Sequence, residues 1–245
     1  LIMYLRLGWV VGNLGLGKTV LVVLISSAIT FITGLSASAI ATNIRIGVGG
    51  EYYMIAHSLG LEFGGAIGIP LYLCRTLSIT FYSFGLAESI AVLTGGWSWM
   101  AGPHAVPVLT AVIIILITAL SGKSASLALK LQVPIMIAVG LSIAALLIAA
   151  LSAGFRAPEM ESTYRTAPAG FWYVFAVFFP AVTGFTAGVG MSGDLKDSSR
   201  SIPRGTLLAV LTVALVNVLM PTVFSITRSV GFEALAQEGG GSWTK

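Results

Sequence analysis

Long stretches without charged side chains alternate with short charged segments along almost the whole of this sequence. Only 9% of its 245 residues are charged, while 56% are hydrophobic. An ordinary soluble domain carries about 25% charged residues, so a soluble fold of this size could not cover its surface. This balance excludes a soluble enzyme, a nucleic-acid-binding protein and a disordered chain, and it indicates a helical membrane protein.

Six of these stretches are long enough to cross a bilayer as a helix, which takes about 20 residues. The apolar stretch 1–11 is only half that long, so we expect a fragment of six and a half spans. A short amphipathic helix is expected at the membrane surface over 48–59, and Pro203 is expected at the start of the last span. The six full spans are expected at 19–44, 63–87, 105–122, 131–155, 166–193 and 205–227.

Two glycine-rich segments match nucleotide-binding patterns without the context that such sites need. Residues 12–19 fit the phosphate-loop pattern GxxxxGK[ST], but apolar membrane segments flank them instead of a strand and a soluble helix. Residues 188–193 fit GxGxxG, but no strand precedes them and no acidic residue follows at the required distance. We interpret the first as a turn between spans, and neither predicts a bound nucleotide.

The span 166–193 contains features that break a helix near its centre. Pro180 removes a backbone donor and clashes with the preceding turn, and Gly184, Gly188 and Gly190 follow it closely. In lipid, unwound backbone persists only inside protein or beside a water-filled cavity. The break therefore predicts an ion or substrate site, and the alternative is a kinked helix that packs through small residues.

A charged residue inside another span gives a second indication of a site. Arg75 lies near the middle of 63–87, and Tyr82 follows seven residues later on nearly the same helix face. Intramembrane charges usually face protein or water. Arg75 is therefore a candidate anion-binding residue, and the alternative is a structural pairing with a neighbouring helix.

Several segments resemble the cation–chloride cotransporters, in the same order along the chain. They are Arg6-Leu-Gly-Trp-Val-Val-Gly12, Thr33-Gly-Leu-Ser-Ala-Ser-Ala-Ile-Ala-Thr-Asn43, Gly49-Gly-Glu-Tyr-Tyr53, Phe81-Tyr-Ser-Phe-Gly-Leu-Ala-Glu88, Phe178-Phe-Pro-Ala-Val-Thr-Gly184 and Ser192-Gly-Asp-Leu-Lys-Asp197. The resemblance extends to about residue 209, and the absence of Asn-x-Ser/Thr sequons favours a prokaryotic member.

The resemblance implies an all-α integral membrane protein with the five-plus-five inverted-repeat fold of the amino acid–polyamine–cation superfamily. Residues 1–245 would form a single transmembrane transport domain, a fragment from the outer half of the first span through the seventh span and the following outer loop. The broken sixth helix agrees with the interruption after Pro180. The resemblance also sets the orientation, which the loop charges leave open.

The same resemblance assigns roles to individual residues. Potassium would bind to Tyr82, Pro180 and Thr183. Arg75 departs from the family, which usually has a small or neutral residue there; it would be an anion candidate in the inner vestibule or indicate a different anionic substrate. No cofactor and no metal other than the alkali cation are implied. Chloride would bind to backbone groups of Leu1, Ile2, Gly184, Phe185 and Thr186.

The predicted function is symport of potassium with chloride by alternating access, with sodium as a further candidate ion and no enzymatic step. The predicted partners are inorganic ions and the lipid bilayer of the plasma membrane, which a multi-pass protein crosses, with a homodimer as a candidate assembly and no nucleic acid. Two alternatives stay open: an amino acid permease of the same superfamily, and a membrane interaction subunit that does not transport.

Overall fold

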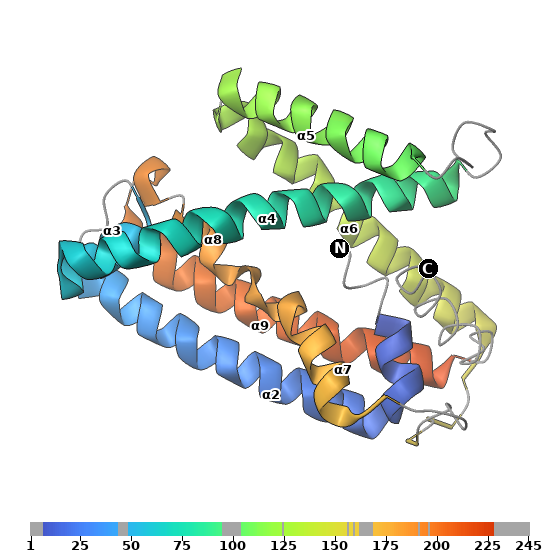
Figure 1. Ribbon diagram of the computed structural model, residues 1–245. Coiled ribbons are helices and arrows are strands. Elements are labelled where there is room, and N and C mark those ends of the chain that lie inside the picture. Colours follow the sequence, from blue (N-terminus) through green and yellow to red (C-terminus); the bar gives the residue numbers. More distant parts are fainter. Residues whose placement is uncertain are drawn as a thin grey trace. The chain divides into compact units, whose positions relative to one another are not determined.

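In the computed structural model the protein is almost entirely helical (Figure 1). The structure describes residues 7–43, 49–94, 104–123, 125–155, 157–158, 160–161, 169–190, 192–195 and 197–227. The chain divides into two compact units. The first unit comprises mainly Met3–Ile67 and Leu147–Lys245, and the second comprises mainly Gly68–Leu146.

The first unit begins with α2, Leu7–Asn43, a helix that bends sharply at Gly15. Gly15 has φ 72° and ψ 170°, and a Cβ added to it would lie 2.5 Å from the backbone carbonyl oxygen of Met160. Only glycine fits both this conformation and this close approach. The bend separates the expected half span from the first full span, and the segment that matches the phosphate-loop pattern is this bent helix.

The long limb of α2 packs against α9, Ser198–Ile226, and the two helices run antiparallel. The buried face of α2 repeats a small residue every fourth position: Ser26, Thr30, Gly34 and Ser38. A Cβ on Gly34 would lie 3.4 Å from Thr206 Cγ2. Small side chains allow two backbones to approach closely in lipid, where helices associate mainly by packing.

Helix α9 starts earlier than the sequence predicts. Asp197 caps it by accepting a hydrogen bond of 3.3 Å from the backbone N–H of Arg200. The expectation that Pro203 begins this helix is therefore wrong, because Ser198 is its first residue. The cap outweighs the proline, which near a helix start removes only one backbone bond.

A short helix, α3 (Glu51–Leu59), precedes α4 (Leu61–Leu93), so the prediction of a short helix here is confirmed in its last nine residues. Helices α5 (Ala105–Lys123) and α6 (Ala125–Ala153) follow. Helix α4 belongs mostly to the second unit, as do α5 and most of α6.

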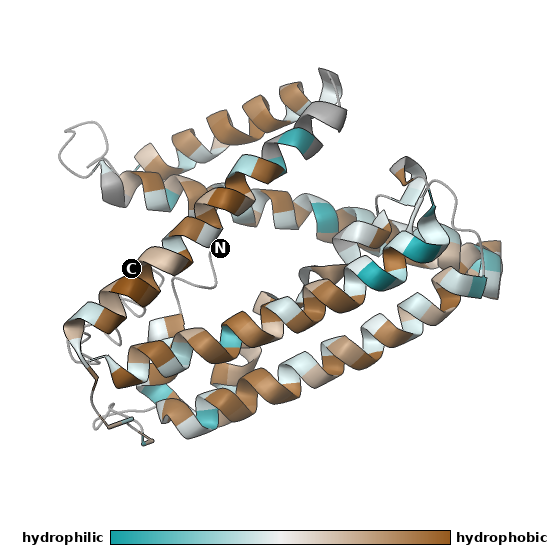
Figure 2. Ribbon diagram, turned by 180° about the vertical axis from the view of Figure 1, so that it is seen from behind, coloured by the Kyte–Doolittle hydropathy of each residue, from teal (hydrophilic) through white to brown (hydrophobic). Residues whose placement is uncertain are grey.

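Five helices of the described part are long and apolar enough to cross a membrane. They are Leu7–Asn43, Ala105–Gly122, Gln132–Ala153, Phe171–Gly190 and Ser198–Ile226. The expected span 63–87 is not among them, since Arg75 and several hydroxyl side chains lower the hydropathy of α4. Hydrophobic residues predominate along the helices (Figure 2), and many large ones are exposed, such as Ile32 at 64%. Exposure of this kind is stable in lipid and costly in water.

Candidate functional site

The interrupted helix is the most irregular part of the first unit. It consists of α7 (Phe171–Phe178), a 3₁₀ segment η1 (Phe179–Thr186), the four-residue α8 (Ala187–Gly190) and the short 3₁₀ turn η2 (Ser192–Asp194). The regular α-helix ends immediately before Pro180, which has no N–H to continue the hydrogen-bond ladder. The predicted break is confirmed, and it takes the form of eight residues of tighter helix.

One face of this irregular segment is packed and another is open. Val174, Phe178 and Val182 are buried at successive intervals of four residues. Pro180, Thr183 and Gly184 are exposed, and a Cβ added to Gly184 would meet nothing within 4 Å. Helices α2 and α9 both contact η1. The open face of the break therefore carries Pro180 and Thr183, two of the three residues expected to bind potassium.

The structure brings the oxygen atoms of these two residues together. Thr183 Oγ1 donates a hydrogen bond of 2.9 Å to the backbone carbonyl of Pro180. The Thr183 hydroxyl oxygen keeps its lone pairs, whereas the Pro180 carbonyl, which lies in the 3₁₀ segment, is also engaged by the N–H three residues on. Oxygens of this type replace the hydration shell of an alkali cation in ion pathways. A cation site here would need further ligands and release of the Pro180 carbonyl from its helix bond.

Tyr82, the third expected potassium ligand, lies on α4 in the second unit. Its side chain is 58% exposed, and its ring packs edge-on against that of Phe81 at 5.9 Å between centroids. Arg75 is exposed on the same helix. Ser78, which lies between them, donates its hydroxyl to the carbonyl of Cys74 at 2.7 Å. Arg75 and Tyr82 thus lie seven residues apart on nearly the same face of α4.

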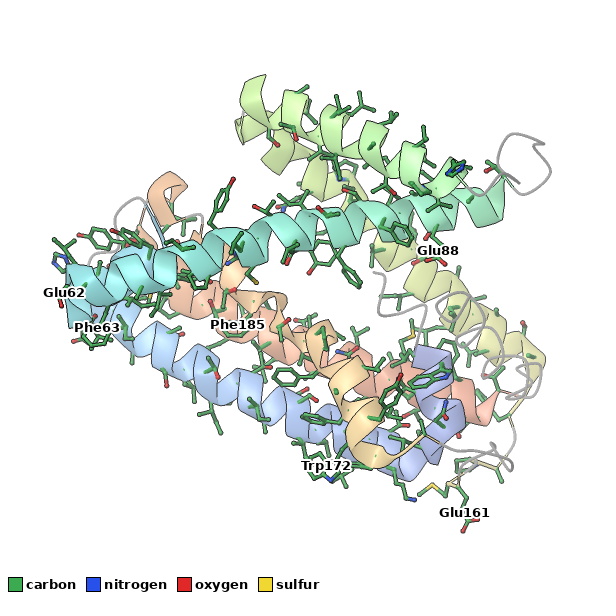
Figure 3. All side chains as sticks on the ribbon, viewed as in Figure 1. Glu62, Phe63, Glu88, Glu161, Trp172 and Phe185 are labelled. Atoms are coloured by element: carbon green, nitrogen blue, oxygen red, sulfur yellow. The ribbon has the colours of Figure 1, made fainter. Side chains whose placement is uncertain are left out.

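The residues expected to bind chloride fall into two groups. Leu1 and Ile2 lie outside the described residues. Gly184, Phe185 and Thr186 form the end of η1, where Figure 3 labels Phe185. A 3₁₀ turn engages each N–H with the carbonyl three residues earlier, so the last turn must open before these groups can bind an anion. The helix dipole adds little, because α8 has only four residues.

The N-terminal end of the interrupted helix is held by Asn13, which is not among the residues singled out from the sequence. Asn13 is 4% exposed; its Oδ1 accepts a hydrogen bond of 3.0 Å from the N–H of Ala169, and its Nδ2 donates one of 2.9 Å to the carbonyl of Trp9. Trp9 and Tyr173 also pack edge-on at 6.2 Å. A lone asparagine within an apolar segment is the signal that could have identified this contact.

The C-terminal end, at α8, is held by Gly50, just before α3. A Cβ on Gly50 would lie 2.7 Å from both Gly190 Cα and the Val189 carbonyl oxygen. Val189 is fully buried, in a cluster with Ala41, Met54 and Ile202. The surface helix α3 is thereby seated against the end of α8, and the interrupted helix is fixed at both ends.

A family model described as amino acid permease matches residues 1–236. The chain belongs to the amino acid permease family. It is therefore part of a membrane transport protein and not of an enzyme. This membership agrees with the apolar helices and with the interrupted helix described above.

Curated relatives match most of the chain. Solute carrier family 12 member 1 of Mus musculus is 36% identical over 244 residues, which is 92% of this chain and 22% of the relative. Solute carrier family 12 member 2 of Homo sapiens is 35% identical over 231 residues, 88% of this chain and 19% of the relative. Solute carrier family 12 member 3 of Pseudopleuronectes americanus is 32% identical over 226 residues, 85% of this chain and 22% of the relative. The chain thus spans about a fifth of the length of these relatives.

Proposed function

We propose that this chain forms part of a symporter that moves potassium together with chloride, with sodium as a further candidate ion. The observation that carries the proposal is the pair of oxygens from Pro180 and Thr183, 2.9 Å apart on the open face of a broken membrane helix. The residue-level resemblance to cation–chloride cotransporters and the solute carrier relatives support it.

In this proposal, Tyr82, Pro180 and Thr183 bind potassium, while Leu1, Ile2, Gly184, Phe185 and Thr186 bind chloride through backbone groups. Each ion offsets the charge of the other, which makes simultaneous binding favourable in a medium of low dielectric constant. Alternating access of the five-plus-five inverted-repeat fold then moves both ions across the plasma membrane. A single transport domain over 1–245, a homodimer and a prokaryotic origin stay predictions.

The test is uptake of labelled rubidium into membrane vesicles that contain the protein, with chloride or gluconate and with or without sodium. We expect uptake that requires chloride, and the response to sodium decides whether sodium is cotransported. Uptake that does not depend on chloride would refute the proposal.

Two substitutions test the potassium ligands. Tyr82→Phe and Thr183→Val each remove one oxygen with little change of shape. Each should raise the KM for rubidium roughly tenfold or more, because one contact with a charged group contributes about 1.5–3 kcal/mol. The matched controls are Tyr72→Phe on the same helix, where Tyr72 is 71% exposed, and Thr33→Val, whose exposed hydroxyl bonds to its own helix. An unchanged KM in either test variant would remove that residue from the site.

A second candidate is an amino acid permease, which the description of the matching family model favours. Arg75 would then bind the substrate carboxylate. Uptake of a labelled amino acid that Arg75→Lys weakens, in vesicles without chloride-dependent rubidium uptake, would establish this alternative.

A further inference from the structure

The contact between α2 and α9 contains two buried polar side chains that break the pattern of their neighbours. Along the small-residue face of α2, Thr30 Oγ1 donates to the carbonyl of Ser26 at 2.9 Å, and Ser38 Oγ donates to the carbonyl of Gly34 at 2.6 Å. Ser26 Oγ has no hydrogen-bond partner among the described residues, although Ser26 is 0% exposed. Thr30 and Ser38 thus satisfy their hydroxyls within the helix, and Ser26 does not.

The corresponding exception on α9 is Asn217. It is 2% exposed, and its Nδ2 also has no hydrogen-bond partner within the described part of the chain. An unsatisfied amide in this environment costs free energy comparable to a lost hydrogen bond. Both helices therefore bury polar groups that their own backbone does not satisfy: Ser26 and Ser27 on α2, and Asn217 on α9.

The register of the two antiparallel helices places these two groups at about the same level along the helix axes. A Cβ on Gly34 would lie 3.4 Å from Thr206 and 4.0 Å from Val210, so Gly34 faces this part of α9. Ser26 lies eight residues before Gly34, about 12 Å along the axis. Because α9 runs in the opposite direction, the same distance corresponds to eight residues after Thr206 and Val210, at positions 214 and 218. The buried Asn217 lies between these positions.

We propose that one water molecule binds between Ser26 and Asn217 and joins α2 to α9 near the level of α7. The water would accept a hydrogen bond from Asn217 Nδ2 and donate one to Ser26 Oγ. Both groups are neutral, and the amide nitrogen repels a cation, so the chemistry suits water and not an alkali ion. The inference does not depend on the transported substrate.

The first experiment is a double-mutant cycle with Ser26→Ala, Asn217→Leu and the double variant. Unfolding is measured by titration with sodium dodecyl sulfate in mixed micelles. Each single substitution leaves one polar group unpaired, and the double substitution leaves neither, so the effects should be non-additive. The coupling should change the unfolding equilibrium constant roughly threefold to sixteenfold, the range found for polar contacts between membrane helices.

Ser27→Ala is the matched control for this cycle. Ser27 Oγ is also buried without a partner among the described residues, but it lies 100° around α2 from Ser26. Its effect should add to that of Asn217→Leu. Additive effects for Ser26 with Asn217, or equal coupling for Ser27, would overturn the proposal. So would coupling that disappears when gluconate replaces chloride, because an anion would then occupy the position.

A further variant tests the geometry without requiring the cycle. Ser26→Asn extends the side chain into the space of the water and should leave the unfolding midpoint at or above that of the unaltered protein. A lowered midpoint for Ser26→Asn would refute the water.

Discussion

Substitution of Gly50 by alanine tests the contact that holds the α8 end of the interrupted helix. Gly50 has φ 53° and ψ −120°, a conformation open essentially to glycine alone, and forcing another residue into it costs about 1–3 kcal/mol. The new Cβ would also lie 2.7 Å from Gly190 Cα and the Val189 carbonyl oxygen. These are backbone atoms, so the loop itself must move away.

That movement would uncover the cluster around Val189, which is 0% exposed. Exposing one valine costs about 1.5–3 kcal/mol. With the backbone strain, we expect Gly50→Ala to lower the free energy of unfolding by about 3–5 kcal/mol. The measurement is thermal or detergent-induced unfolding of purified protein, combined with the amount of folded protein in the membrane.

Two other glycines separate the strain from the steric clash. Gly60 has φ 99° and ψ 164°, but a Cβ there would meet nothing within 4 Å, so Gly60→Ala tests strain alone. Gly65 lies within α4 with open space around it, and Gly65→Ala should stabilise by up to about 1 kcal/mol. If Gly50→Ala were no more destabilising than Gly60→Ala, the contact with Val189 and Gly190 would be refuted.

Three further substitutions test the contact of Asn13 with Ala169, the cap of α9 and the charge of Arg75. Asn13→Leu should lower the free energy of unfolding by about 1–3 kcal/mol, since it leaves the Ala169 N–H unpaired. The control is Asn43→Leu, because Asn43 is exposed. An equal effect of the two substitutions would contradict the role of Asn13. Asp197→Ala should cost about 1 kcal/mol through loss of the cap, and an unchanged unfolding midpoint would argue against it. Arg75→Ala should raise the KM for the transported anion while the protein still reaches the membrane, whereas loss of membrane expression would assign Arg75 a structural pairing.

The features that could be predicted from sequence are those that depend on local chemistry. The interruption after Pro180 follows from a missing N–H and from nearby glycines, and it forms where the residues predict it. The membrane helices follow from uncharged stretches of sufficient length. The expected start of α9 is wrong although it also depends on local chemistry, because the residue that begins the helix is capped by Asp197 and Pro203 lies five residues into the helix.

The contacts that hold the interrupted helix depend on residues distant in sequence, and no local pattern encodes them. Asn13 meets Ala169 across 156 positions, and Gly50 meets Gly190 across 140. A glycine in a loop predicts conformational freedom, but its neighbour is determined by how α3 and α8 pack. The pairing of Ser26 with Asn217 likewise needs the register of α2 against α9 before it can be stated.

The chemistry of Pro180 extends beyond its own carbonyl group. In an α-helix the carbonyl of Ala176 would accept a hydrogen bond from the backbone N–H of residue 180, and in a 3₁₀ helix the carbonyl of Val177 would accept it. Because residue 180 is proline, it has no N–H to donate to either carbonyl. Phe179 still donates to Phe175, so the loss begins immediately after that bond. In lipid a carbonyl oxygen released in this way needs another partner. Ala176 and Val177 both lie in α7, just before η1, and in the proposed symporter a cation bound near Thr183 would take the place of the missing backbone donor.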